Sequence, residues 1–134
     1  MIRTRFKKVL LVSPGVSSAQ LVTDFQNVKH IDVLTRIFPA IYEETPNLII
    51  FDHNYVGKDM EKIIRRIRTN SFYNKVKICC YKTKPEIKND ALLKAIGVDY
   101  FIYQDDLQAA QKRSNLSSIF NEIIDRPVMG MATN

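Results

Sequence analysis

An aspartate at the end of an apolar run is the residue whose position most clearly suggests chemistry. Asp52 directly follows the four apolar residues at 48–51. An uninterrupted apolar run of this length indicates a strand that is buried on both faces. Asp52 would then lie at the carboxyl end of the strand, where open α/β sheets bind their ligands. There the carboxylate could accept a phosphoryl group, or it could end the strand and cap the following turn.

The other residues capable of chemistry form no recognisable catalytic set. His53 adjoins Asp52, but neighbouring residues on a strand point to opposite faces, so the two need not form a pair. His30 has no partner at a metal-ligand spacing. The segment SPGVSSA contains one glycine and fits neither nucleotide phosphate fingerprint, although its hydroxyls and amides leave flavin binding open as an alternative. We therefore expect no enzymatic activity and no cofactor.

Apolar patterning divides the chain into alternating strands and helices. The expected strands cover 9–12, 28–35, 48–51, 75–82 and 100–103. The expected helices follow Ser17 or Ser18, span 38–44, begin at Asp59, begin near Thr83 and span 115–125. Such alternation predicts an α/β fold with a mostly parallel sheet and helices on both faces. The right-handed crossover rule then favours a doubly wound, five-stranded, flavodoxin-like three-layer sandwich.

Two of the expected helices carry specific predictions about burial and capping. The helix that begins at Asp59 should bury one apolar face, made of Met60, Ile63, Ile64 and Ile67. The next helix should begin with a capping box of Thr83 and Glu86 and end at Gly97. Its apolar side should consist of Ile87, Ala91, Ala95 and Ile96. The segment 52–58 between strand and helix is expected to be a loop.

Length and composition indicate one domain. The 134 residues fit a single domain, 1–134, with a core at about 7–125 and a frayed tail at 127–134. The apolar run at 9–12 is too short for a signal peptide, and no run reaches the length of a membrane span, so we expect a cytoplasmic protein without membrane insertion. Cys79 and Cys80 are adjacent on an expected strand, which predicts two free buried thiols.

The net charge of +6 permits, without requiring, contact with nucleic acid or acidic proteins. The densest basic stretch lies on the helix that begins at Asp59. Its cations are Lys62, Arg65, Arg66 and Arg68. They form either an ordinary solvated helix face or a docking surface for an acidic partner.

The order of these elements resembles the receiver domain of bacterial response regulators. The resemblance covers about residues 7–125 and is strongest in PNLIIFDHNYVGKDMEKIIRRIR and in ALLKAIGVDYFIYQ. It places Asp52 at the phosphoacceptor position and Asn54 where the family uses a backbone carbonyl as a metal ligand. The family's acidic pair, which holds magnesium, falls on Ser13 and Pro14. The hydroxyl residue after the fourth strand falls on Lys82, or on Thr83 if the register slips by one.

Further positions of the resemblance lie in and after the fifth strand. The family's lysine falls on Gln104, and the proline that follows it falls on Asp105. The switch aromatic falls on Phe101, whose lack of a hydroxyl suits a buried position. Tyr100 and Tyr103 flank it. The segment 105–114 is longer than the usual link to the last helix, which implies an altered docking face.

These departures predict an acidic pocket that lacks the charges its chemistry needs. Phosphoryl transfer to a carboxylate brings two anions together and requires a divalent cation and a cationic side chain placed in advance. Magnesium prefers carboxylate oxygens, and Asp52 is the one carboxylate that the resemblance places in the pocket. Lys82 could replace the missing cation by pairing with Asp52. Magnesium is expected only if the site is a working phosphoreceiver.

We therefore expect an atypical receiver-like domain of two-component-type signalling that works by docking to a protein, without phosphorylation. The partner would be a histidine kinase or a downstream signalling protein. One alternative is a phosphorelay receiver phosphorylated on Asp52. Another is a basic nucleic-acid-binding adaptor, although no helix-turn-helix is visible. The oligomeric state does not follow from the sequence.

Overall fold

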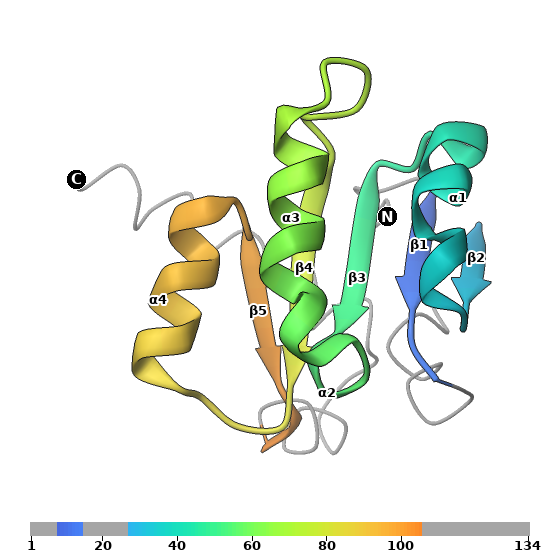
Figure 1. The fold of residues 1–134 in the computed structure, drawn as a ribbon. Coiled ribbons are helices and arrows are strands. Elements are labelled where there is room, and N and C mark those ends of the chain that lie inside the picture. The colour runs from blue at the N-terminus through green and yellow to red at the C-terminus, as the bar shows by residue number, and fades with distance from the viewer. Residues whose placement is uncertain (1–7, 15–26, 106–134) are drawn as a thin grey trace, which may run out of the picture.

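The five predicted strands form one parallel sheet. The computed structural model describes residues 8–14 and 27–105. The strands are β1 (Val9–Val12), β2 (Val28–Ile31), β3 (Leu48–Asp52), β4 (Lys77–Lys82) and β5 (Tyr100–Tyr103). Their order in the sheet is β2-β1-β3-β4-β5, and every neighbouring pair is parallel (Figure 1). The predicted α/β class with a five-stranded parallel sheet is confirmed.

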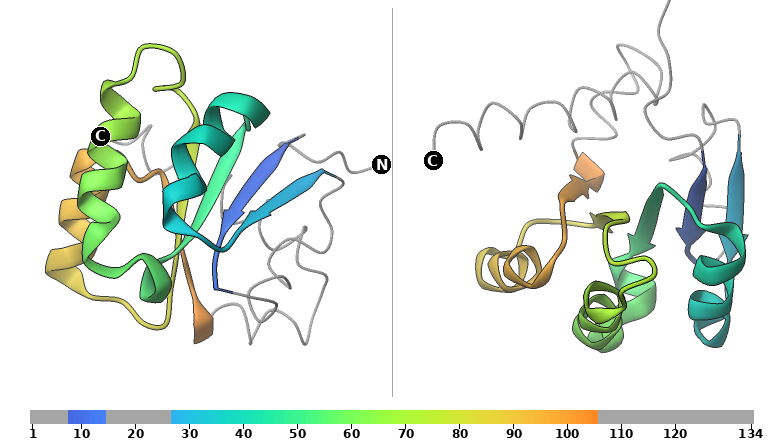
Figure 2. Two further views of the ribbon diagram at one scale, coloured as in Figure 1. Left: turned by 45° about the vertical axis from the view of Figure 1, so that its right-hand side comes forward. Right: turned by 90° about the horizontal axis from the view of Figure 1, so that it is seen from above.

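The described helices lie between these strands. They are the 3-10 helix η2 (Leu34–Arg36), α1 (Ile37–Glu44), α2 (His53–Val56), the 3-10 helix η3 (Gly57–Asp59), α3 (Met60–Thr69) and α4 (Ile87–Ile96). Figure 2 shows that α1, α3 and α4 lie on the same side of the sheet. The helices predicted after Ser17 or Ser18 and at 115–125 fall outside the described residues, as does most of the segment 105–114. No described helix has the length and apolar character needed to cross a bilayer.

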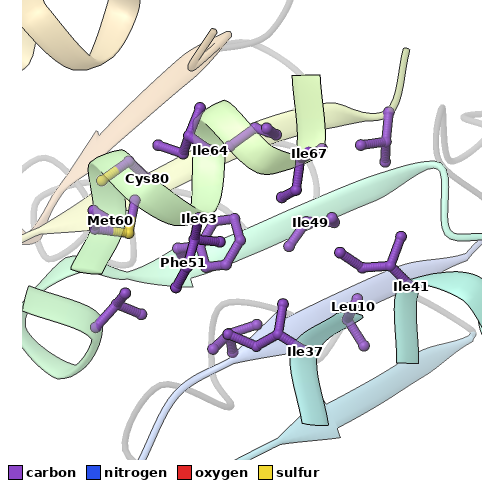
Figure 3. Close-up of a cluster of buried hydrophobic side chains, with 14 of the residues drawn as sticks. Leu10, Ile37, Ile41, Ile49, Phe51, Met60, Ile63, Ile64, Ile67 and Cys80 are labelled. Atoms are coloured by element: carbon purple, nitrogen blue, oxygen red, sulfur yellow. The ribbon is translucent and has the colours of Figure 1, made fainter. Parts of the chain in front are cut away.

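The core between the sheet and these helices is aliphatic. Side chains of α1 and α3 pack onto the strand residues that face them, including Leu10, Ile49 and Phe51 (Figure 3). The predicted buried face of α3 is confirmed, since Met60, Ile63, Ile64 and Ile67 are all buried. The strand residues that point to the other face, such as Leu48 and Ile50, are also fully buried. The prediction that the third strand is buried on both faces is therefore confirmed.

The two cysteines are free and buried, as predicted. Cys80 packs in the core cluster, whereas Cys79, its neighbour on β4, points to the opposite face. Burial raises the pKa of the Cys80 thiol to about 12, so this thiol is protonated at neutral pH. Both cysteines serve as small apolar core residues rather than as nucleophiles.

The limits of several predicted segments differ in the structure: the fourth strand, predicted at 75–82, begins at Lys77, and two further segments differ more. The second strand was predicted to extend over 28–35, but β2 ends at Ile31 and a 3-10 turn begins at Leu34. The segment 52–58 was predicted to be a loop, but it forms α2 and the first part of η3. Gly57, with φ +63°, joins these two helical turns. A four-residue helix is too short to show apolar periodicity, which explains the wrong prediction.

The predictions for α4 were wrong at its start and along its apolar side. The helix begins at Ile87, and no side chain caps it in the way a Thr83–Glu86 capping box would. Ile87 is 88% exposed, and Ala91 and Ala95 are exposed as well. Leu93 is the fully buried residue of α4, and Ile96 packs partly against the core. Gly97 ends the helix as predicted, with φ +137°.

The predicted basic face of α3 is mostly engaged within the protein. Arg65 pairs with Glu61 one turn earlier on the helix. The Arg66 guanidinium lies 3.9 Å from the centre of the Phe38 ring on α1, which is cation–π geometry. Arg68 is not part of a solvated face, since it donates to the carbonyl oxygens of Asn74, Val76 and Gly97 and pairs with Asp99. These contacts fix the α3–β4 loop and the α4–β5 turn to α3.

Arg68 and Arg65 therefore differ sharply in their contribution to stability. The variant Arg68→Met removes several charge-assisted hydrogen bonds and should lower the free energy of unfolding by about 2 kcal/mol. The matched variant Arg65→Met removes one exposed pair and should cost less than about 0.5 kcal/mol. Urea unfolding followed by circular dichroism compares the two. Equal losses would contradict the structural role of Arg68.

Candidate functional site

Asp52 is the last residue of β3 and the N-cap of α2. Its side chain is 7% exposed, and one carboxylate oxygen accepts a hydrogen bond from the Asn54 backbone nitrogen at 3.1 Å. The sequence left open whether Asp52 serves chemistry or capping, and the structure shows that it caps a turn. The same position lies at the carboxyl end of the sheet, where α/β folds place ligands.

Ser13, next to the end of β1, is held by His30 from β2. Ser13 is fully buried, and its hydroxyl oxygen lies 2.9 Å from His30 Nε2. The same nitrogen lies 3.0 Å from the Ser13 carbonyl oxygen, which can only accept, so Nε2 carries the proton and donates. A serine activated as a nucleophile would instead donate to the imidazole. His30 therefore has a partner that its place in the sequence does not predict, and the contact is structural rather than catalytic. Pro14, the next residue, is exposed.

A direct contact joins α2, which follows β3, to the loop that follows β4. The side-chain amide nitrogen of Asn54, Nδ2, donates to the Thr83 hydroxyl at 2.5 Å. Thr83 therefore does not cap α4 but binds the first turn after Asp52. The last residue of β4 is Lys82, and Thr83 lies one residue beyond the strand. The Thr83 hydroxyl lies beside the turn that Asp52 caps.

Tyr81 is the neighbour of Asp52 that the sequence analysis missed. The sheet register pairs Asp52 with Tyr81, so their side chains leave the sheet on the same face. Burial, and next the carboxylate of Asp52, raise the pKa of the Tyr81 hydroxyl. This tyrosine therefore stays protonated next to the carboxylate at neutral pH. Its position follows only from the register of β3 against β4, which the sequence does not reveal.

Lys82, the residue predicted to pair with Asp52, instead binds two acids. Lys82 is 2% exposed, and its ammonium lies 2.8 Å from Glu86 Oε1 and also contacts Asp90 Oδ1. Tyr103 of β5 donates to the other Asp90 oxygen at 2.8 Å. We call these four residues, Lys82, Glu86, Asp90 and Tyr103, the Lys82 clasp. It joins β4, the start of α4 and β5.

Strand alternation explains why Lys82 and Asp52 are apart. Tyr81 shares a face with Asp52, so Lys82, one residue later, points to the opposite face. That face carries α4, and Lys82 follows Ile78 and Cys80 of the core cluster along it. The predicted ion pair between Lys82 and Asp52 is therefore replaced by the ion pairs of the clasp. It also follows that Asp52 is not the only carboxylate near this end of the sheet.

The clasp favours the charged forms of its members. Burial opposes ionisation of Asp90, but hydrogen bonds from Lys82 and Tyr103 outweigh it, so the pKa of the carboxyl is lowered. Burial likewise opposes the charge of Lys82, and its bonds to Asp90 and Glu86 outweigh that effect and raise its pKa. A hydrogen bond from Lys82 lowers the pKa of Glu86. Lys82, Glu86 and Asp90 are thus all ionised at neutral pH.

The predicted switch aromatic, Phe101, lies beside the clasp. Phe101 is partly buried against the core, and its ring stacks on that of Tyr103 with centroids 6.1 Å apart. Because Phe101 lacks a hydroxyl, the polar contact to α4 comes from Tyr103, two residues on along the same face of β5. Tyr100 pairs in register with Cys79 and lies on the other face.

His53 links the Asp52 turn to α4. Its Nε2 lies 3.2 Å from the Asn89 amide nitrogen, which fits a neutral ring that accepts from the amide. Burial, and next the positive charge of Lys82, lower the pKa of this imidazole. His53 is the first residue of α2 rather than a strand residue, and this hydrogen bond directs its ring toward α4.

The residues at the predicted metal positions do not fit a magnesium ion. The Ser13 hydroxyl accepts from His30 and Pro14 has no side-chain oxygen, so neither supplies a carboxylate ligand. Magnesium prefers carboxylates in near-octahedral geometry, and the pair of acids it would need is absent from these positions. Within residues 8–14 and 27–105, no three or more His, Cys, Asp or Glu side chains lie close enough together to hold a metal ion. Gln104, directly after β5, is uncharged and partly buried.

Response-regulator receiver domains are among the solved structures that resemble this chain. No protein-family model and no curated protein sequence matches the chain. The chemotaxis response regulator CheY4 of Vibrio cholerae is 18% identical, with a TM-score of 0.66 over 86% of this chain and 93% of that one. The receiver domain of a DNA-binding response regulator (merR) from Colwellia psychrerythraea is 11% identical, with a TM-score of 0.67 over 88% and 98%. The phosphorylated cyanobacterial phytochrome response regulator RcpA is 18% identical, with a TM-score of 0.62 over 96% of each chain.

These similarities show that the chain has the fold of response-regulator receiver domains. The predicted flavodoxin-like class is confirmed by them. In the sheet β3 lies between β1 and β4, so the carboxyl ends of these two strands adjoin Asp52. A shared fold does not determine the chemistry of the residues at these ends.

The clasp predicts an acid-dependent contribution of Asp90 to stability. Because its pKa is lowered on folding, the contribution is full above the unfolded value of about 3.9 and is lost as the pH falls through the lower folded value. At pH 7 the free energy of unfolding of wild type should exceed that of Asp90→Asn by about 1 kcal/mol, after allowance for solvent screening. The difference should shrink steadily below about pH 4. Urea unfolding across this range measures it, with Glu43→Gln, at an exposed acid of α1, as the control. A difference that stays constant down to about pH 2 would contradict the account.

Proposed function

We propose that this protein is an atypical receiver domain in two-component-type signal transduction that acts by binding another protein without being phosphorylated. The receiver fold and the position of Asp52 support the signalling class. The residues around Asp52 support the departure from phosphorylation. The partner belongs to the class of histidine kinases or downstream signalling proteins.

The observation that carries the proposal is the orientation of Lys82. It was the residue best placed to supply the missing positive charge, and its ammonium is instead neutralised by Glu86 and Asp90 on the face of the sheet that carries α4. Ser13 and Gln104 supply no charge. None of these three positions therefore supplies the electrostatic stabilisation that transfer of a phosphoryl anion to Asp52 requires.

The outer surface of α4 supports docking as the mode of action. Ile87, Ala91 and Ala95 lie along one exposed side of this helix, and Leu92 is 41% exposed. Exposed lysines, Lys84 and Lys88, adjoin them. An apolar strip rimmed by cations is suited to a protein partner with apolar and acidic side chains.

The two alternatives have weaker support. The phosphorelay alternative rests on the position of Asp52 and on the fold it shares with RcpA, which was crystallised in a phosphorylated form. The nucleic-acid alternative relied on four cations of α3, of which Arg65 and Arg66 are engaged with Glu61 and Phe38, and Arg68 is a structural residue.

Intact-mass measurement after incubation with a small phosphodonor and magnesium tests the proposal. Wild type should show no added phosphoryl group, because the charges that stabilise the transition state are missing. A mass gain in wild type that disappears in Asp52→Asn would establish the phosphorelay alternative instead.

A restored variant provides the positive control. Ser13→Asp, Pro14→Asp and Gln104→Lys together supply the acidic pair and the lysine that the pocket lacks. This variant, once shown to be folded by circular dichroism, should gain a phosphoryl group that Asp52→Asn removes. A folded variant that stays unmodified would show that these missing charges are not the reason for the inactivity of wild type.

A further inference from the structure

The attachment of α4 to the sheet depends on unusually few apolar contacts. Among the residues of α4, Leu93 is the one that is fully buried, and Ile96 adds a partly buried contact. By comparison α3, of the same length, buries Met60, Ile63, Ile64 and Ile67. Apolar burial is the main force that holds a helix on a sheet. A helix attached so sparsely would move easily unless polar contacts fix it.

The Lys82 clasp supplies these polar contacts at the start of α4. The Lys82 ammonium is bound by Glu86, the N-cap of α4, and by Asp90, one turn later. Asp90 also accepts from the Glu86 backbone nitrogen at 3.1 Å and from the Tyr103 hydroxyl. The clasp therefore fixes the first turn of α4 to the ends of both β4 and β5.

Because Lys82 is buried, moving α4 to a different position on the sheet would be energetically costly. The Lys82 side chain is 3% exposed and the Asp90 side chain 13%. Moving α4 away would leave a buried ammonium and a buried carboxylate without their partners, which is far more costly than breaking an exposed pair. His53 and Asn89, in contact on the same side of α4, would also have to separate.

We propose that Lys82 is a positioning residue that fixes α4 in a single orientation, so that the outer surface of this helix is presented constitutively. Its importance for binding rests on the proposed function, in which the outer surface of α4 docks a partner. The proposal that Lys82 fixes the orientation of α4 on the sheet does not depend on that function. A ligand can shift α4 only by as much as it favours a second state, and the clasp disfavours every state in which Lys82 loses its acids.

Amide hydrogen exchange in the full chain tests the fixed position of α4. In Lys82→Met the side chain keeps most of its length but loses its charge, and the amides of 87–96 should exchange at least about tenfold faster than in wild type. The amides of β3 and α3 should change much less. The control is Lys88→Met, which removes an exposed lysine of the same helix and should leave exchange in α4 within about twofold of wild type.

A milder variant keeps the test informative if Lys82→Met does not fold. Tyr103→Phe removes one hydrogen bond to Asp90 and leaves the ion pairs, so α4 exchange should rise by a smaller factor with little change elsewhere. Unchanged α4 exchange in both variants would overturn the proposal. A uniform rise over all elements would also overturn it, because the clasp would then stabilise the whole fold rather than position α4.

The result for Lys82→Met can be interpreted separately from whether Asp52 is phosphorylated. Exchange is measured in wild type before and after addition of beryllofluoride and magnesium, with intact mass as the separate test of phosphorylation. Faster exchange of α4 in Lys82→Met supports the clasp even if wild type proves to be phosphorylated. If α4 exchange in wild type changes by more than about tenfold on adding beryllofluoride, the helix has a second accessible state and the fixed position is refuted.

Discussion

Side-chain alternation along β4 is the constraint from which the character of this site follows. Tyr81 and Lys82 are adjacent, so one shares the face of Asp52 and the other points to α4. A neutral, protonated tyrosine therefore lies beside the acid, and the cation is neutralised by Glu86 and Asp90. A shift of one residue in this register would exchange the two. The positive charge of Lys82 therefore pairs with acids at the start of α4 instead of with Asp52.

The structure divides the carboxyl end of the sheet into two polar groups. The first lies around Asp52 and consists of a capped turn, the Asn54–Thr83 contact and the pairing with Tyr81. The second is the Lys82 clasp, on the face that carries α4. His53 adjoins both, since it follows Asp52 in the chain and contacts Asn89 on α4. The first group places one acid beside a protonated tyrosine, and the second has charges whose partners are already in place.

The sequence predicted the strands, the helix that begins after Asp59 and the place of Asp52, because these depend on local apolar periodicity and on the order of elements. Predictions from the sequence were wrong where a residue's position depends on strand register or on contacts between distant segments. The outward side of α4 was predicted to be buried because Ile87, Ala91 and Ala95 have helical spacing, but burial falls on Leu93 and the polar clasp supplies the rest. The role of Arg68 was also hidden, because its partners lie on loops that no periodicity describes.

The most direct measurement of the central claim is a structure determined after soaking with magnesium and beryllofluoride. The account predicts an unmodified Asp52 that still caps the turn at Asn54, with Lys82 bound to Glu86 and Asp90. A magnesium ion and a beryllofluoride group on Asp52, with Lys82 released from its acids, would contradict it.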